Sequence, residues 1–362
     1  LHDALPIFVH GAAGFDHAVA TYMDMPQFFP LPRGVPHYVL GRIPKDAIST
    51  VKLMQGSLVA GSLTRLVMRI KPAAIVAWLQ PSLPIVFAAA RMTGVKFYFS
   101  AHGGNLDGTN SEAESRKLNW LSRHFCRGIE AIHYVSLQSR LWHEQHGFPP
   151  NKGVVIANGI DMHRFNASPP PRSEPFHILQ PARFVPEKNH AVLLAAAAML
   201  RGKGLRFRIS CVGRDTNGPA FAALVAKHGV GDVVTGHGCI SDIETWYGRA
   251  DAVVLSSDIE NAPLVILEAL ACGRPVVSTR VGIAEEVIRD CGVVVPRSDA
   301  AGMARGLHEI IDRRDEYAER AWREGPGRIA QNYALERMIE QWSTMIRCGL
   351  LSEGLPPAAH VG

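Results

Sequence analysis

The sequence predicts an α/β protein made of two doubly wound domains, each with a parallel sheet. The first observation is the length of 362 residues. A single hydrophobic core stops growing near ~250–300 residues, so two domains are expected. The second is the repeated alternation of short apolar runs with helix-length segments, which is typical of parallel sheets covered on both faces. The third is a proline-rich segment, residues 167–175, which separates two series of this kind.

Apolar runs of strand length occur in both halves of the chain. In the first half they are Ile7–Val9, His37–Leu40, Ala73–Leu79, Lys96–Ser100, Ala131–Val135 and Val154–Ala157. In the second half they are Phe176–Gln180, Phe207–Val212, Val233–Thr235, Ala252–Leu255, Pro275–Ser278 and Val293–Val295. Helices are predicted between them at Thr50–Ile70, Leu83–Met92, Ser115–Arg127, Ser139–His146, His190–Leu200, Ala220–His228, Pro263–Cys272, Ala284–Arg289 and Ala300–Asp312.

The segment between the two series indicates the domain boundaries. Residues 167–175 contain four prolines in nine positions. Proline fixes φ and cannot donate to a strand ladder, so this segment is predicted to be an extended connector. We therefore expect a first domain over residues 1–166 and a second over 176–326. A final helix over 327–350 is expected to return to the first domain.

The charge is unevenly distributed along the chain. Residues 1–166 hold 16 Lys and Arg against 10 Asp and Glu, whereas residues 167–362 hold 22 against 23. This excess is too weak for a dedicated nucleic-acid binder. It is suited to a domain that faces phosphate or an anionic surface.

The cysteines and the apolar segments predict a cytoplasmic protein. No two of the six cysteines have a C-x-x-C spacing, so neither a disulfide framework nor a zinc ribbon is expected. We expect no secretory leader, and a start that lacks some residues. Residues 72–90 carry no charge, but Gln80, Pro81 and Pro84 favour a strand, a turn and a helix over a membrane span.

The strongest motif is the segment 256–277, SSDIENAPLVILEALACGRPVV. Pro263 opens a predicted helix, whose N-terminal amides and dipole favour an anion. Glu260 precedes this helix, and Glu268 lies within it among apolar residues, where an unpaired carboxylate is costly. Ligand hydroxyls would satisfy Glu268. The alternative is that Glu260 is a solvated loop charge and that Glu268 pairs with an arginine.

A second motif, QPARFVPEKN at 180–189, places two cations after a predicted strand. Arg183 and Lys188 precede the helix that begins at His190, an arrangement typical of a diphosphate clamp. The alternative is a pair of surface cations.

Three weaker signals lie in the first half. Asn158 and Gly159 follow a strand with turn chemistry, and the alternative is a plain turn at a domain boundary. His102 and two glycines end another strand in SAHGGN, where backbone and imidazole can approach a ligand. Gly11 and Gly14 follow the first apolar run and could cradle a phosphate, although a lone G-x-x-G is a weak signal. No cluster of carboxylates or cysteines accompanies His143 and His146, so no metal site is predicted.

Taken together, these motifs resemble the family 4 glycosyltransferases, which have the GT-B fold of two facing Rossmann-like domains and retain the anomeric configuration. The matching segments include AHGG, ANGIDMHRF, ARFVPEKNHAVLLAA, VGRD and the long stretch from GCISDIETWYGRAD to GRPVVST, and they span about residues 70–315. The family signature is a glutamate, seven residues and a second glutamate, here Glu260 and Glu268. The resemblance implies a nucleotide-diphosphate sugar as donor, a glycan or lipid-linked acceptor, and no essential metal or other cofactor.

The resemblance also implies roles for single residues. Arg183 and Lys188 would hold the diphosphate of the donor and stabilise its charge as it leaves. Glu260 would face the donor sugar, and Glu268 would bind the ribose hydroxyls. His102 would reach toward the donor sugar from the first domain.

Further donor contacts are implied for the backbone amides of Asn261, Ala262 and Leu264, while Asn158 would shape the cleft near the hinge. The sequence departs from the family where Gly282 is followed by Ile283 rather than by a second glycine. This departure concerns local packing only.

Other enzyme classes fit the sequence less well. A nucleotide-sugar epimerase of the same fold would lack the paired Arg-x4-Lys and Glu-x7-Glu motifs, and a phosphorylase would need a longer chain. A non-catalytic nucleotide-sugar-binding protein would be expected to lose one of the four ionic residues. A dehydrogenase and a metal-dependent single-domain transferase are disfavoured because neither G-x-G-x-x-G nor Asp-x-Asp occurs.

The segment Ser115–Arg127 is a predicted amphipathic helix that could contact a membrane. Leu118, Leu121 and Phe125 share one helical face, and four cations surround it. An ordinary helix packed on the core has this pattern, as does a basic amphipathic patch that rests on anionic lipid near a lipid-linked acceptor.

Overall fold

The computed structural model describes residues 16–21, 34–41, 49–102 and 122–351. The chain divides into two compact units. Unit 1 comprises Leu1–Asn158 and Glu336–Gly362, and unit 2 comprises Gly159–Leu335.

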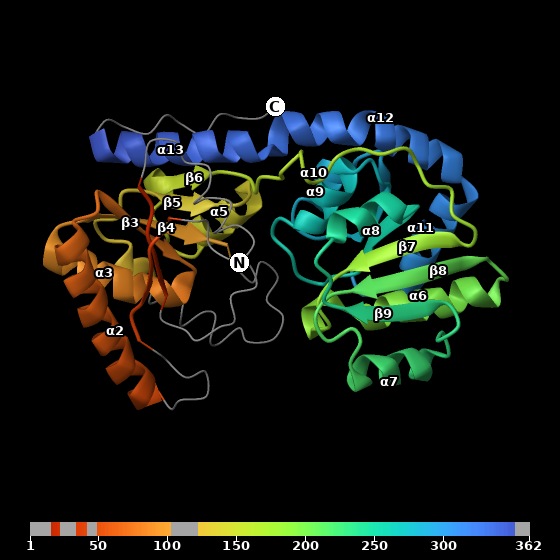
Figure 1. The fold of residues 1–362 in the computed structure, drawn as a ribbon, viewed down its shortest axis with the longest axis horizontal. Helices are drawn as coiled ribbons and strands as arrows, with labels where there is room; N and C mark the ends of the chain where they lie inside the picture. The colour runs from red at the N-terminus through yellow and green to blue at the C-terminus, as the bar shows by residue number, and fades with distance from the viewer. Residues whose placement is uncertain (1–15, 22–33, 42–48, 103–121, 352–362) are drawn as a thin grey trace. The chain divides into compact units, whose positions relative to one another are not determined.

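Unit 1 is built on a four-stranded parallel sheet in the order β3-β4-β5-β6 (Figure 1). Its strands are β3 (Ala74–Trp78), β4 (Lys96–Ala101), β5 (Ile132–Tyr134) and β6 (Gly153–Val155). Its helices are α2 (Ser49–Ile70), α3 (Leu83–Thr93), α5 (Leu137–Gln145) and α13 (Leu335–Leu351), with short 3-10 turns η1 (Gln80–Ser82) and η2 (Pro150–Lys152). A separate parallel pair is formed by β1 (Val19–Thr21) and β2 (His37–Val39).

Unit 2 is a six-stranded parallel sheet in the order β12-β11-β10-β7-β8-β9. The strands are β7 (Phe176–Pro181), β8 (Phe207–Val212), β9 (Val234–Gly238), β10 (Ala252–Leu255), β11 (Val276–Thr279) and β12 (Gly292–Val295). The helical elements are η3 (Pro186–Lys188), α6 (His190–Gly202), α7 (Pro219–His228), α8 (Ile243–Arg249), α9 (Leu264–Ala271), α10 (Ala284–Ile288), α11 (Ala300–Asp312) and α12 (Arg314–Tyr333).

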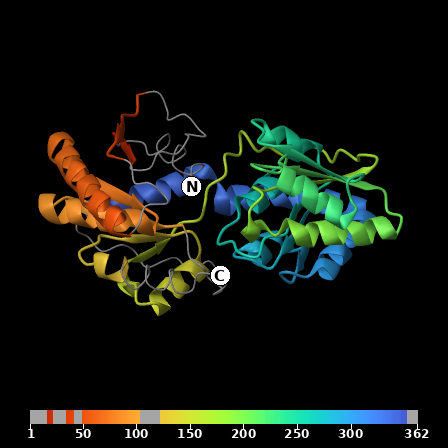
Figure 2. The same cartoon turned by 90° about the horizontal axis from the view of Figure 1, so that it is seen from below.

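Helices cover both faces of the unit 2 sheet. Helices α6 and α7 lie on one face, in front of the strands in Figure 2. Side chains of α6 and α11 share a core with β7, β8 and β10, in which Leu193, Ile178 and Val254 are fully buried. Strands buried on both faces are mostly apolar, which explains why a strand such as β10 forms a continuous apolar run.

The helix α12 approaches α9 closely on the other face. A Cβ on Gly325 would lie 2.7 Å from the carbonyl oxygen of Leu270, so only glycine permits this approach. Pro326 follows inside the same helix. The helix ends at Tyr333, and α13 begins at Leu335.

The domain boundaries differ from the predicted ones. The units divide after Asn158 and after Leu335, and the expected connector 167–175 belongs to unit 2. The guanidinium of the buried Arg274 donates to the backbone oxygens of Ser168 and Pro169, at 2.8 and 3.2 Å. These bonds fix the proline-rich segment to unit 2, so it cannot be a free connector.

The chain passes from unit 1 to unit 2 after Asn158 and returns after Leu335, and the backbone near these two points is hydrogen-bonded together. The backbone N–H of Ile160 donates to the oxygen of Tyr333, at 2.8 Å, and the N–H of Leu335 donates to the oxygen of Ile160, at 3.0 Å. Ala334 between them is extended, with φ −66° and ψ 144°, which separates α12 from α13. The predicted single tail helix over 327–350 is therefore two helices.

Helix α13 packs within unit 1. The ring of Trp342 lies 4.5 Å from that of His133 in β5 and 5.5 Å from that of Trp78 in β3, measured between centroids. The hydroxyl of Tyr98 in β4 donates to the oxygen of Ile346, at 3.1 Å. Trp342 is 1% exposed, so this helix completes the core of unit 1.

Candidate active site

The strand order of unit 2 determines where a ligand can bind. The chain runs outward from β7 through β8 to β9, then returns to β10 on the other side of β7. The strand order therefore reverses between β7 and β10. In open α/β sheets, ligands bind at such a point, beyond the carboxyl ends of the strands. The loops after β7 and β10 carry the two strongest motifs of the sequence.

The loop after β7 presents the two predicted cations. Arg183 is exposed, and Lys188 ends the short turn η3. Asn189 follows in the left-handed region, with φ 40° and ψ 55°, and its side chain accepts a hydrogen bond from the N–H of Val192. Asparagine tolerates this conformation and is a favoured N-cap, so α6 begins immediately after the cations.

The loop after β10 places Glu260 against Lys188. The ammonium group of Lys188 donates to Oε1 of Glu260, and the hydroxyl of Ser257 donates to the same oxygen, at 2.9 Å. The two charged side chains are 20% and 16% exposed. They form a half-buried ion pair at the point where the strand order reverses.

Close backbone approaches hold both loops in place. A Cβ on Gly282, at φ +47°, would lie 2.2 Å from the oxygen of Asn261. A Cβ on Gly213, at φ +145°, would lie 2.3 Å from the oxygen of Ala182. Any side chain at these two positions would displace the loops that carry Glu260 and Arg183.

The second glutamate has a partner that the sequence did not indicate. The hydroxyl of Tyr247, in α8, donates to Oε2 of Glu268, in α9, at 2.6 Å. Tyr247 is fully buried, and this burial, together with the neighbouring carboxylate, raises the pKa of its phenol well above 10. Tyr247 is thus one partner of Glu268, and the alternative of an arginine partner stays a prediction. The phenol stays protonated and remains a donor to Glu268.

The remaining predicted donor contacts lie at the start of α9. Asn261 and Ala262 are half-buried in the loop, and Leu264 is the first residue of the helix. Pro263 is the N-cap rather than the first helical residue, with φ −68° and ψ 113°. Helix N-termini attract anions because their first amides have no partner within the helix.

His102 and Asn158 belong to unit 1 and follow the carboxyl ends of β4 and β6. The ring of His102 stacks on that of Trp78, with centroids 4.9 Å apart, and lies 5.4 Å from that of His133. Burial lowers the pKa of His102 to about 3, so its imidazole is neutral at physiological pH. It can therefore act in hydrogen bonding but not as a cation. Asn158 is the last residue of unit 1 before the chain passes to unit 2.

The structure thus brings some of the predicted residues together. Lys188 and Glu260 are in contact, and Arg183 lies in the same loop as Lys188. Glu268 follows Glu260 in the next helix, held by Tyr247. Tyr247, Ser257 and Asp258 were not identified from the sequence, because their roles depend on partners far away in the chain. The glycine pair Gly11 and Gly14 lies outside the described residues.

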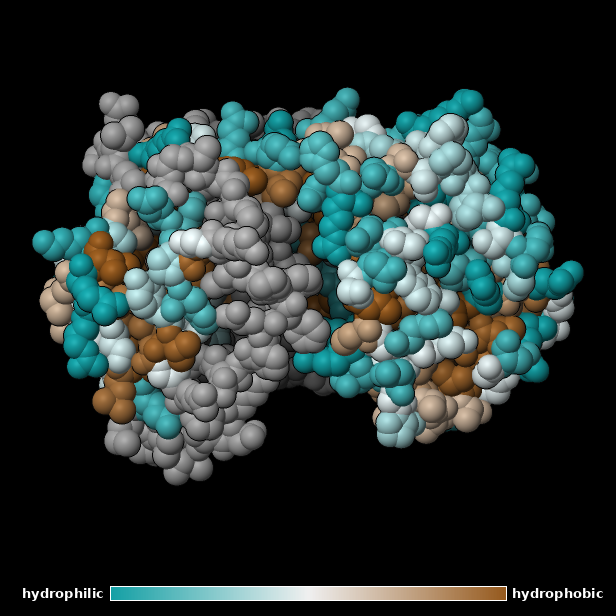
Figure 3. Space-filling model, in the orientation of Figure 1, coloured by the Kyte–Doolittle hydropathy of each residue, from teal (hydrophilic) through white to brown (hydrophobic). Residues whose placement is uncertain are grey.

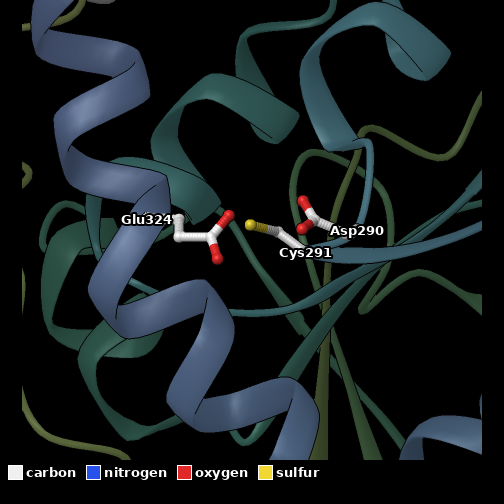
Figure 4. Close-up of side chains that lie close together, drawn as sticks. All are labelled: Asp290, Cys291 and Glu324. Atoms are coloured by element: carbon white, nitrogen blue, oxygen red, sulfur yellow. The ribbon is translucent and has the colours of Figure 1, made fainter.

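A group with metal-ligand chemistry lies elsewhere in unit 2. Among the residues that the structure describes, Asp290, Cys291 and Glu324 are the one His, Cys, Asp or Glu group close enough to hold a metal ion (Figure 4). However, Arg328 donates to Asp290, at 3.1 Å, and to Glu324, at 3.3 Å. Burial raises the pKa of the Cys291 thiol to about 11. Because the guanidinium of Arg328 already pairs with both carboxylates, this group is a salt-bridge cluster.

Known protein families match both parts of the chain. The family described as Glycosyltransferase Family 4 matches residues 11–164, and Glycosyl transferases group 1 matches residues 175–313. A D-inositol 3-phosphate glycosyltransferase of Arthrobacter sp. is 34% identical over 174 residues, or 44% of this chain and 41% of that protein. The putative colanic acid biosynthesis glycosyltransferase WcaL of Salmonella typhimurium is 27% identical over 212 residues, or 56% of this chain and 52% of that protein. The chain thus spans about half the length of these curated relatives.

Solved structures share the fold. A sucrose-phosphate synthase from Thermosynechococcus elongatus has a TM-score of 0.82 at 19% identity, covering 94% of this chain and 91% of that one. Anabaena Alr3699/HepE in complex with UDP-glucose has a TM-score of 0.74 at 20% identity, covering 88% and 86%. The two Rossmann-like units and the two matched family regions agree, and they identify this chain as a member of glycosyltransferase family 4 with the GT-B fold.

Proposed function

We propose that this protein is a retaining glycosyltransferase that moves a sugar from a nucleotide-diphosphate sugar to a glycan or lipid-linked acceptor. The observation that carries the proposal is the Lys188–Glu260 pair at the point where the strand order of unit 2 reverses. Arg183 and Lys188 follow β7, and Glu260 and Glu268 follow the neighbouring strand β10. The solved structures that share the fold of this chain include one in complex with UDP-glucose.

The proposed chemistry follows from the charges. When the bond between the sugar and the diphosphate breaks, negative charge develops on the phosphate oxygens. Arg183 and Lys188 are fixed cations that stabilise this charge. Because they supply two positive charges, we propose that no divalent metal is essential.

The carboxylates bind the neutral parts of the donor. Glu260 accepts hydrogen bonds from the sugar hydroxyls, and Glu268 accepts them from the ribose. Amides at the start of α9, at Asn261, Ala262 and Leu264, bind the sugar and phosphates. In unit 1, His102 and Asn158 stay predicted donor-site residues, and the neutral imidazole of His102 would act there through hydrogen bonding.

An incubation with a panel of nucleotide sugars tests the activity. Release of free nucleoside diphosphate, measured with and without candidate glycan acceptors and with a metal chelator, is the readout. We expect release from one nucleotide sugar, faster with an acceptor and unaffected by the chelator. An epimerase would convert the sugar without net transfer, and a binding protein would release nothing, so either result would overturn the proposal.

We further propose that unit 1 contacts an anionic membrane peripherally, near a lipid-linked acceptor. The predicted segment Ser115–Arg127 lies mostly outside the described residues, and its Phe125 packs against Phe87, with ring centroids 5.4 Å apart. The outer face of α2 is the better candidate. Leu58 and Met68 are 65% and 57% exposed there, beside the exposed cations Arg65 and Arg69.

The composition around this face supports the choice. Residues 55–102 contain no Asp or Glu, and Met92 of α3 is 73% exposed. Figure 3 shows hydrophobic side chains among hydrophilic ones in the region of α2 and α3. Each cation near an anionic surface contributes about 1 kcal/mol. Among the described residues, no helix is long and apolar enough to cross a bilayer.

Vesicle co-sedimentation tests the membrane contact. We expect binding to anionic vesicles at low salt, little binding to neutral ones, and loss of binding in R65E/R69E. The variant R323E, at an exposed arginine of α12, is the control and should bind like the unchanged protein. Equal recovery of all forms in the supernatant would contradict the contact.

The six free cysteines support a cytoplasmic location.

A further inference from the structure

Asp258 connects three loops at the carboxyl edge of the unit 2 sheet. Its Oδ2 accepts a hydrogen bond from Nδ2 of Asn189, at 2.7 Å, in the loop after β7. Its Oδ1 accepts one from the hydroxyl of Ser298, at 2.9 Å, in the loop after β12. Arg297, beside Ser298, donates to its backbone oxygen at 3.3 Å. Asp258 itself lies in the loop after β10, so one carboxylate holds together loops from three strands.

This bridge lies next to the proposed catalytic pair on both sides. Asp258 is two positions before Glu260, and Asn189 immediately follows Lys188. The backbone N–H of Asp258 also donates to the oxygen of Glu187, at 2.9 Å. The hydroxyl of Ser256 donates to the oxygen of Lys188, at 2.9 Å. The two loops are therefore joined by hydrogen bonds that do not involve the charged side chains of Lys188 and Glu260.

The conformation of Asn189 depends on the same bridge. A non-glycine residue at φ 40° is in the left-handed region, which persists only where the surrounding structure fixes it. The amide oxygen of Asn189 accepts from the N–H of Val192, at 3.3 Å, so its nitrogen faces Asp258. Both the oxygen and the nitrogen of the Asn189 amide are hydrogen-bonded, and these two bonds fix the direction of the backbone after Lys188.

We propose that Asp258 is a positioning residue, which with Asn189 holds Lys188 and Glu260 in the geometry that the donor requires. The inference rests on the proposed function. Both carboxylate oxygens of Asp258 bind protein groups, so it acts through the pair and not by touching substrate. Misplacement of a catalytic group by about 1 Å can cost ~100-fold in rate, which is why such a bridge matters.

Exchange of the two side chains is the test. In Asp258→Asn, an amide nitrogen faces the nitrogen of Asn189, or else the new amide turns around and donates to the hydroxyl of Ser298; in either case the stronger hydrogen bonds to a carboxylate are lost. In Asn189→Asp, two carboxylates face each other. The double variant D258N/N189D restores one donor and one acceptor with reversed direction. Aspartate at 189 still accepts from Val192, since Asp and Asn are equally good N-caps.

Turnover at saturating donor and binding of free nucleoside monophosphate are the two activity readouts. The monophosphate lacks the second phosphate that Lys188 would hold. We expect each single variant to lose about 10–100-fold in kcat, with monophosphate Kd changed less than about twofold, and the double variant to recover to within about threefold of wild-type kcat. The control is Asp232→Asn, since Asp232 accepts from Arg201, at 2.7 Å, at an exposed position of the same unit. Its kcat should not change.

Hydrogen–deuterium exchange separates this inference from the proposed function. Peptides covering residues 183–189 and 256–262 should exchange faster in both single variants and at the wild-type rate in the double variant. If the unchanged protein turned over no nucleotide sugar, the proposed function would fail while exchange still tested the bridge. A double variant no better than the singles in exchange or turnover would overturn the positioning role, as would single variants that keep full activity.

Discussion

The ammonium group of Lys188 donates a hydrogen bond to Oε1 of Glu260, although the two residues are 72 positions apart in the sequence. Each stands on the loop that follows one of two neighbouring strands, β7 and β10, where the strand order reverses. The pair is half-buried, so removal of either partner leaves a charge that water only partly compensates. A bound donor would take over some of these contacts, with phosphate at Lys188 and sugar hydroxyls at Glu260.

The phosphate clamp gives the first prediction. Lys188→Ala and Arg183→Ala should each lower turnover about 100–1,000-fold, since stabilisation of a leaving group of this kind is worth about 2.7–4 kcal/mol. Steady-state assays at saturating donor measure the effect, and circular dichroism checks folding. The control is Arg201→Ala, which removes an exposed cation of the same unit. A folded clamp variant with more than about a third of wild-type turnover would show that the residue does not act on the diphosphate.

The two glutamates are predicted to differ in what they bind. Glu260→Gln should reduce turnover and leave nucleotide affinity intact, because its proposed contacts are to the sugar. Glu268→Ala should weaken nucleotide binding itself, because its proposed contacts are to ribose. Calorimetric titration with free nucleoside diphosphate distinguishes them. Equal loss of affinity in both variants would remove this division of roles.

The phenol of Tyr247 is predicted to sharpen ribose recognition. It fixes Oε2 of Glu268 with a 2.6 Å hydrogen bond, so Tyr247→Phe should leave the carboxylate less well oriented. We expect the preference for a ribonucleotide over its 2′-deoxy and 3′-deoxy forms to fall about 5–10-fold, the worth of roughly one ordinary hydrogen bond of about 1 kcal/mol.

The chain offers a matched control for this variant. Tyr317 is also buried and donates to a glutamate, Glu309, at 2.5 Å, between α11 and α12. Tyr317→Phe should leave the discrimination unchanged. If the two tyrosine variants behaved alike, the effect would come from lost stability and not from the ribose site.

Buried histidines should make the protein sensitive to mild acid. Burial lowers the pKa of His190 from its usual 6.5 to about 4, and that of His143 likewise to about 4. The unfolded chain then binds more protons between these values, so the stabilisation is complete above pH 6.5 and is lost as pH falls toward 4. The slope is about 1.4 kcal/mol per pH unit for each histidine.

Urea unfolding at pH 7.5 and 5.5 measures this linkage. His190 is 2% exposed and lies among Phe184 and Phe221, so His190→Phe suits the site and removes one titrating group. The loss of unfolding free energy between the two pH values should shrink by about 1 kcal/mol in this variant. His163→Phe, at an exposed turn, is the control. An unchanged loss in His190→Phe would mean that His190 is not held neutral.

Much of the fold was predictable because its strands are buried on both faces. Ala252–Leu255 is apolar throughout and fully buried, so its pattern was legible without the structure. Helix α12 was not predicted over its first part, because it is polar and contains Pro326 between two glycines. Its close approach to α9 at Gly325 depends on a contact that no local pattern shows.

The candidate site was predictable to the extent that its residues follow strands. Parallel strands bring their carboxyl ends to one edge, so the loops of Lys188 and Glu260 were expected to meet. The choice of hydrogen-bond partners was not, because a tyrosine in α8 and an aspartate in the next loop can point in several directions. Tyr247 and Asp258 acquire their roles only once β10 lies beside β7.

The stereochemistry of transfer tests the proposed retaining reaction most directly. Proton NMR of the new glycosidic bond, recorded with the nucleotide sugar that the panel identifies, gives the anomeric configuration from the coupling constant. We expect the product to have the same anomeric configuration as the donor, because the acceptor attacks on the face from which the diphosphate held by Arg183 and Lys188 departs. A product of inverted configuration would contradict the proposed retaining reaction.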